Sequence, residues 1–336
     1  MPHKKLYSVL TILLFLMTLV SCVDEKQEQK KYTIATGGIT GLYYKSGENL
    51  SLLMNKRQIT HGYHFEAQLT GGSVSNIKSL MKGEHQFAFV QTDRLYQAYN
   101  GLAEWKKSGP SEKLRSLFCL HSEIVSLVVA EDSGINNIED IKGKRINIGN
   151  TGSGLLQNTR EILQACNISE KDFKASNLKM MDVLKKMKTS EIDGFFYTAG
   201  HPNVSIEDAF ADKRKLKFIH LNNSSINQMI KESLYYSAGE TPTHYYPASM
   251  VKEKIPAPAL RACLSCSSEL DNDTVYTLVK YVFENLEEFK QMHLAHQELT
   301  PKIMLENVSV PVHPGALKYY KEKGLDKHIP KAFLKD

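Results

Sequence analysis

A unit of an apolar strand, a glycine-rich turn and an amphipathic helix recurs along this chain and most limits its possible folds. The unit occupies residues 32–54, then 65–81, and appears again at 145–166. A short strand at 87–90, followed by a helix, continues the alternation without the glycines. Strands that alternate with helices in this way are typical of parallel sheets. The sequence therefore predicts an α/β fold with a largely parallel sheet.

The same pattern predicts two lobes. A long strand is expected at 114–130, after which the unit begins again. We expect lobe 1 to comprise residues 32–123 plus 242–336, and lobe 2 to comprise 124–241. The last segment reads as a strand followed by helices, which should return to lobe 1. Two lobes joined by two crossings are what a hinged binding protein requires, with a ligand cleft between the lobes.

Glycine loops at 36–42, 70–73 and 149–155 stand where strands lead into helices. A helix start leaves backbone N–H groups unpaired and carries about half a positive charge, so each loop can hold an anion. A purely structural role would explain any one such turn. Two loops in lobe 1 and one in lobe 2 favour a site for the carboxylates of a small acid. Hydroxyl donors would come from Thr36, Thr40, Thr70, Ser73, Thr151 and Ser153.

Nucleotides and nucleic acids fit the sequence poorly. The glycines of 149–154 do not follow the GxGxxG spacing, and no loop continues into Gly-Lys-Ser/Thr. The formal net charge is +5, and removal of Lys4 and Lys5 with a leader leaves +3. That balance does not indicate nucleic acid. We therefore predict no cofactor and no nucleic-acid partner.

The N-terminus has the parts of a signal peptide in residues 1–21: a basic start, an apolar run from Val9 to Val20, and a small residue before Cys22. The ending LVSC resembles the lipobox of bacterial lipoproteins, which implies lipid on Cys22 and anchoring to a bilayer. An ordinary signal peptide with a chance cysteine is the alternative. Residues 22–31 read as a solvated tether. We expect the protein in the periplasm or at the cell exterior.

The remaining cysteines do not predict a metal site. Cys263 and Cys266 have no second CxxC beside them, and the surrounding ALRACLSC alternates like a strand. His293 and His296 have no evident third ligand, and a solvated helix face is the preferred interpretation. Buried thiols or one structural disulfide are expected for Cys119, Cys166, Cys263 and Cys266.

A family resemblance follows the same residues. The segments IATGGITGLYY, LTGGSVSNI, FVQTD, IGNTGSG, IDGFFYTAGHPN and VPVHPGALKYYKEKG resemble, in order and spacing, the signatures of TAXI-type solute receptors of TRAP transporters. The resemblance runs from Tyr32 to Gly324. It implies a type II periplasmic-binding-protein fold and a receptor without catalysis. It also implies a small carboxylate ligand, glutamate-like or another organic acid, and a TRAP permease driven by an ion gradient.

The resemblance carries over a set of ligand-binding residues. Asp93 also fits a plain helix N-cap, and His201 also fits a surface loop. Tyr43 is preferred to Tyr44 for the cleft, because adjacent helical residues point about 100° apart. The set is Gly38, Thr40, Gly41, Leu42, Tyr43, Gly72, Ser73, Gln91, Asp93, Thr151, Gly152, Ser153, Gly154, Tyr197 and His201.

Three classes of function remain in competition. A transport receptor is the leading hypothesis. An enzyme on the same fold would need a nucleophile within reach of a base, and no Cys/His arrangement of that kind is evident. A lipoprotein sensor or accessory protein is the third, and a neighbouring kinase gene would support it over transport.

Overall fold

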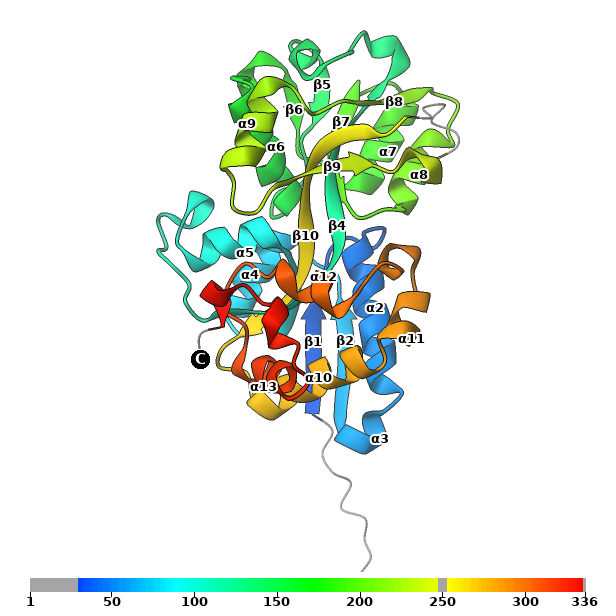
Figure 1. Cartoon of the computed structure of the whole chain (residues 1–336). Coiled ribbons are helices and arrows are strands. Elements are labelled where there is room, and N and C mark those ends of the chain that lie inside the picture. Colours follow the sequence, from blue (N-terminus) through cyan, green and yellow to red (C-terminus); the bar gives the residue numbers. More distant parts are fainter. Residues whose placement is uncertain (1–29, 247–252, 335–336) are drawn as a thin grey trace, which may run out of the picture.

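Two long antiparallel strands, β4 (Leu114–Ala130) and β10 (Ile255–Ser267), run lengthwise through both lobes of the molecule (Figure 1). They pair with each other where one lobe meets the next, with Glu123 of β4 opposite Leu260 of β10. This computed structural model describes residues 30–246 and 253–334. The predicted signal peptide and Cys22 lie outside the described residues.

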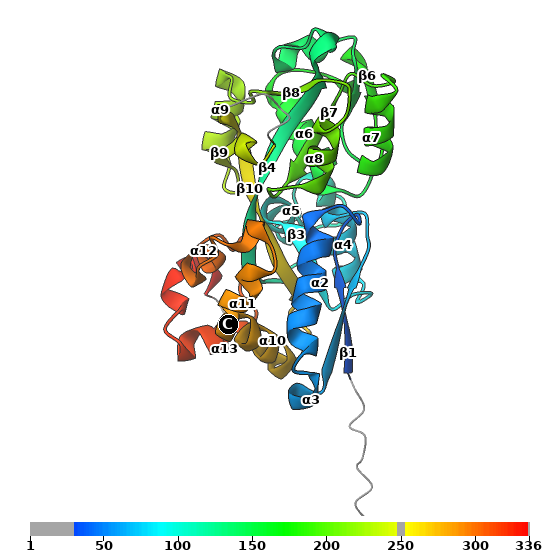
Figure 2. The same cartoon turned by 90° about the vertical axis from the view of Figure 1, so that its right-hand side faces the viewer.

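The first lobe is built on the strand order β2-β1-β3-β10-β4. Its β1 (Lys30–Ala35) is parallel to β2 (Tyr63–Gln68) and to β3 (Phe87–Gln91), whereas β10 is antiparallel to β3. Their side chains share one apolar core with the surrounding helices. These helices are α2 (Leu42–Asn55), α4 (Ser73–Met81), α5 (Thr92–Tyr99), α10 (Asn272–Glu284), α11 (Leu286–Gln291), α12 (Pro301–Glu306) and α13 (Pro314–Glu322), whereas the short α3 (Gln58–His61) has no buried residue. Figure 2 shows α10, α11 and α13 with the N-terminal elements in this lobe, as predicted for the returning segment.

The second lobe extends the same sheet. Its strands are β5 (Arg145–Asn147), β6 (Lys174–Ser176), β7 (Gly194–Ala199), β8 (Leu216–Ile219) and β9 (Ser237–Thr241). Its helices are α6 (Gly154–Ala165), α7 (Met180–Lys188), α8 (Val204–Phe210) and α9 (Ser224–Glu232). Successive residues of β4 pack into two separate cores. Leu127 and Val129 belong to one core, and Val128 and Ala130 belong to the other. The sheet is therefore buried on both faces in this lobe.

The predicted two-lobed α/β fold is confirmed, and most elements lie where the pattern indicated. The prediction of a largely parallel sheet was wrong: four of the described strand pairs are parallel and five are antiparallel, because β4 and β10 run against their neighbours. The strand at 114–130 has the expected bounds, and the helix of the unit at 65–81 ends at Met81 as expected. Strand β1, however, begins at Lys30 and not at Tyr32, because Lys30 and Lys31 pair with β2. The end of the predicted tether thus belongs to the sheet. The residue boundaries assigned to the lobes remain a prediction.

The cysteines in the described part of the chain are free thiols. The buried-thiol alternative describes Cys119, Cys263 and Cys266, whereas Cys166 is half-buried. Cys119 of β4 and Cys263 of β10 face each other in register and are fully buried. Within residues 30–246 and 253–334, no cluster of three or more His, Cys, Asp or Glu side chains could hold a metal ion. None of the described helices is long and apolar enough to cross a membrane.

Candidate functional site

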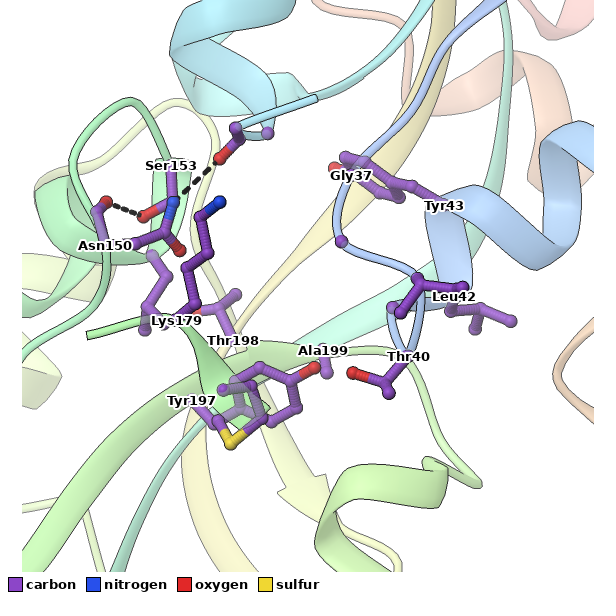
Figure 3. A pocket seen from close by; sticks show the side chains of 18 of the residues that line it. Gly37, Thr40, Leu42, Tyr43, Asn150, Ser153, Lys179, Tyr197, Thr198 and Ala199 are labelled. Atoms are coloured by element: carbon purple, nitrogen blue, oxygen red, sulfur yellow. Dashed lines mark hydrogen bonds between the residues drawn. The ribbon is translucent and has the colours of Figure 1, made fainter. Parts of the chain in front are cut away.

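A pocket of about 550 Å³ lies where the two lobes meet. Residues 37–43 and 69–73 line it from the first lobe, and Glu123 lines it from β4. The second lobe contributes Asn150, Ser153, Gly154, Leu155, Lys179, Met180, Met181, Asp182, Lys185 and residues 197–200. Figure 3 shows the two sets of side chains on opposite sides of one space. This volume is typical of sites for small molecules.

The helices α2, α4, α6 and α7 begin at this pocket. Gly41 and Gly72 precede α2 and α4 and offer no capping side chain. Ser153 precedes α6, and its hydroxyl accepts a hydrogen bond from the N–H of Leu156. No described residue accepts a hydrogen bond from the first two N–H groups of any of these helices. Unpaired N–H groups and the positive ends of helix dipoles therefore converge on the pocket from both lobes, which suits an anion.

Two lysines add positive charge from the second lobe. Lys179 precedes α7 and Lys185 lies within it, and both line the pocket. In Figure 3 the Lys179 side chain extends toward the loops of the first lobe. Neither lysine forms an ion pair with a described residue, and Asp182, an exposed residue of the same helix, has no such partner either. The two ammonium groups are thus available to an anionic ligand.

Glu123 is the buried acid of the pocket. It is 4% exposed, and Tyr43 donates a hydrogen bond from its hydroxyl to Oε2 over 2.8 Å. Burial raises the pKa of Glu123 to about 8, against the opposing effect of the Tyr43 hydrogen bond and with a further rise from the charge of Asp93. Burial also raises the pKa of Tyr43 well above its usual value. The site therefore contains a carboxyl group that is neutral at neutral pH.

The glycine loops of the two lobes contact each other beside the pocket. The N–H of Ser75 donates to the carbonyl of Gly152 over 3.0 Å, and Asn150 Nδ2 donates to the carbonyl of Gly71 over 3.1 Å. A Cβ on Gly154 would lie 1.5 Å from Oε1 of Gln91, so only glycine permits this approach. The loops predicted to bind an anion thus also hold the lobes together.

The structure brings most of the predicted site residues together. Those that line the pocket are Gly38, Thr40, Gly41, Leu42, Tyr43, Gly72, Ser73, Ser153, Gly154 and Tyr197. Thr151 and Gly152 do not line it: Thr151 is exposed, and the carbonyl of Gly152 bonds to Ser75 in the contact between loops.

Three further predicted residues lie outside the pocket, and each of them contacts another side chain of the protein. Gln91 donates from Nε2 to Asn158 Oδ1 over 3.0 Å. Asp93 forms an ion pair with Arg94 and accepts a hydrogen bond from Asn158, so it is neither a pocket residue nor the N-cap of α5, which is Gln91. The Nδ1 atom of His201 is 2.6 Å from the hydroxyl of Tyr246, and burial lowers the pKa of His201 to about 3.

The preferred interpretation of the histidine pair as a solvated face was wrong for His296. Its side chain is fully buried, stacks on Phe289 with ring centroids 4.7 Å apart, and places Nε2 3.0 Å from the hydroxyl of Ser46. Helix α11 ends at Gln291, so the turn that follows it directs His296 inward.

Sequence reasoning missed the charged residues of the pocket. Glu123 stands inside an apolar strand, and a buried charge in such a strand is unusual enough to have indicated it. Lys179 and Lys185 gave no such signal, because lysines near a helix are ordinary surface residues.

Comparison with known proteins gives a family and several distant structures. The model of the NMT1-like family matches residues 34–324. Among solved structures, a putative L-cystine ABC transporter from Listeria monocytogenes is 14% identical, with a TM-score of 0.47 over 78% of this chain and 94% of that one. The periplasmic aliphatic sulphonate binding protein SsuA from Escherichia coli is 10% identical, with a TM-score of 0.44 over 90% of each chain. A putative periplasmic sulfonate-binding protein from Methylobacillus flagellatus is 15% identical, with a TM-score of 0.45 over 91% and 93% of the two chains. The family match extends over both lobes and the strands that join them, and the chain belongs to the NMT1-like family.

Proposed function

We propose that this chain is an extracytoplasmic solute-binding receptor that captures a small carboxylate between its lobes. One observation carries the proposal: unpaired N–H groups at the starts of α2 and α4 in one lobe, and of α6 and α7 in the other, line a single pocket. Lys179 and Lys185 add positive charge to it. Membership of the NMT1-like family is consistent with this role.

The division of the donors between the lobes explains why capture would close the receptor. Micromolar affinity needs about 8 kcal/mol. A hydrogen bond to a charged group contributes about 1.5–3 kcal/mol, so several donors must act together. Because those donors belong to two lobes, the ligand makes all its contacts only when the lobes meet, and it favours the closed state.

The receptor would deliver its solute to a TRAP-type permease of the TAXI class. This part of the proposal rests on the sequence motifs, which resemble TAXI receptors in order and spacing. The lipobox-like LVSC would place lipid on Cys22 and keep the receptor near that permease. We expect a glutamate-like amino acid or another organic acid as the ligand.

A thermal-shift screen against amino acids and dicarboxylates tests the binding role. We expect at least one small acid to raise the melting temperature, by linkage of binding to folding. Native mass spectrometry of the same preparation would detect a ligand retained from the host. A protein that no small acid stabilises, and that retains none, would not be the proposed receptor.

A further inference from the structure

Glu123 differs from the other polar groups that line the pocket. Those groups are mostly donors: the first N–H groups of four helices and the ammonium groups of Lys179 and Lys185. Glu123 is a buried acceptor, with Oε2 bonded to Tyr43 and Oε1 bonded to no described residue. Asp182, the other acidic residue of the pocket, is exposed on α7 and is already solvated.

No cation among residues 30–246 and 253–334 neutralises Glu123. Within the described part of the chain, no lysine or arginine forms an ion pair with it. By contrast, the carboxylate of Asp93, which is also buried, forms an ion pair with Arg94 over 3.0 Å. A buried carboxylate without a partner costs several kcal/mol, so a cation supplied from outside would be stabilised strongly here.

The two kinds of polar group call for a ligand with two kinds of charge. An anionic group satisfies the helix N–H groups and the lysines, and a protonated amine satisfies Glu123. We propose that Glu123 accepts a hydrogen bond from the protonated amino group of the ligand, so that the pocket selects an amino acid over the plain acid of equal length. This inference rests on the proposed receptor function. It adds that Glu123 determines whether the pocket prefers an amino acid or a plain acid.

Binding of an amine should then release a proton. Without a ligand, the carboxyl group of Glu123 is protonated at neutral pH. The titratable groups that face it are Tyr43 of α2, Asp93 at the start of α5 and Tyr197 of β7, and His121, which precedes Glu123 by two residues on β4, contacts the ring of Tyr43. The two tyrosines have raised pKa values and His121 a lowered one, so these three are neutral. The charged groups are Asp93, which is paired with Arg94, and the two lysines of the pocket. An arriving ammonium favours the carboxylate, and the Glu123 proton passes to the solvent.

Isothermal titration calorimetry of the full chain in detergent at pH 7 tests this inference. The probes are matched pairs that differ by the amino group: L-glutamate and glutarate, L-aspartate and succinate, L-alanine and propionate. Titration in Tris and in phosphate, which differ in ionisation enthalpy, counts the protons released. We expect the wild type to bind the amino acid of at least one pair at least tenfold more tightly, with release of up to one proton.

Two variants make the test specific to Glu123. E123Q keeps the shape of the side chain and should reduce the preference within the pair to threefold or less, with no proton released. E131Q alters an exposed acid just beyond the same strand and should behave as the wild type. Circular dichroism and the melting temperature establish that both variants are folded.

The possible failures are distinguishable. If the plain acids bind as tightly as the amino acids, or if E123Q retains the preference, the inference is wrong while the receptor function stands. If no member of any pair binds and the wider screen of small acids is also negative, the receptor function and the inference both fail.

Discussion

Two polar clusters lie between the lobes, and they differ in whether their groups have partners. The Arg94 cluster consists of Asp93, Arg94 and Glu104 of the first lobe and Glu161 of α6. Its guanidinium group, 1% exposed, forms ion pairs with Asp93 over 3.0 Å, with Glu104 over 3.2 Å, and with Glu161. In the pocket, by contrast, helix N–H groups, Lys179 and Oε1 of Glu123 have no described partner.

The comparison separates a structural contact from a binding site. Buried charges that partner each other hold two surfaces together and leave nothing for a ligand. Buried polar groups without partners are costly, and proteins retain them where another molecule completes them. We therefore interpret the Arg94 cluster as a set of ion pairs that holds the two lobes together. The pocket is the place where a ligand completes the interface between the lobes.

The largest effect is expected from R94M. The substitution leaves Asp93 and Glu161 buried or half-buried with no cation, and removal of one partner of such a cluster costs about 3–5 kcal/mol. Urea denaturation followed by circular dichroism measures the loss. The matched control is R160M. Arg160 lies on α6 and forms an exposed ion pair with Glu170 over 2.7 Å, so its loss should cost at most about 1 kcal/mol. Equal losses in the two variants would remove the distinction drawn for the Arg94 cluster.

The next effect concerns pH and Glu123 in the ligand-free protein. Its folded pKa of about 8 lies above the unfolded value near 4.5, so the folded state binds more protons in this range. Stability should therefore fall, relative to E123Q, by about 1.4 kcal/mol per pH unit as pH rises from 5 to 8, and level off above that. Urea denaturation of both proteins from pH 5 to pH 9 checks this. Parallel pH profiles would mean that Glu123 has a partner in solution.

G154A should weaken binding by about tenfold or more. The added Cβ would lie 1.5 Å from Gln91 Oε1, so the loops of the two lobes could not approach as they do here. The variant should lose affinity for the tightest-binding acid of the panel, and circular dichroism establishes that it is folded. Removal of the Gln91 side chain in the double variant Q91A/G154A should restore part of the affinity. If it does not, the close contact between the loops is not what limits closure.

The smallest effect is expected from K179M. Lys179 is exposed, so loss of its charge should weaken binding of the same acid only about threefold to tenfold, and less at high salt. K174M, at an exposed lysine of β6 that does not line the pocket, serves as its control. Similar losses in both variants would indicate a general effect of net charge and not a contact in the pocket.

The sequence predicted those parts of the site that depend on local structure. A strand, a glycine turn and a helix form from neighbouring residues, so the starts of α2, α4 and α6 and their places at the pocket followed from the pattern. The start of α7 did not, because no glycine turn precedes that helix in the sequence. Lys179, which precedes α7, and its first residues Met180 and Met181 line the pocket.

The partners across the lobes were beyond such reasoning. Gln91 and Asp93 stand at a strand end, where a ligand contact is plausible from local pattern alone. Their actual neighbour is Asn158, which is more than sixty residues away in sequence and forms a hydrogen bond with each of the two side chains.

The most direct test of the account is a crystal structure with the tightest-binding acid of the panel. We predict density for a carboxylate within hydrogen-bond distance of the first N–H groups of α2 or α4 and also of α6 or α7, with the Arg94 cluster unchanged. An acid held by one lobe alone, or bound outside the pocket, would contradict the claim that a ligand completes the interface between the lobes.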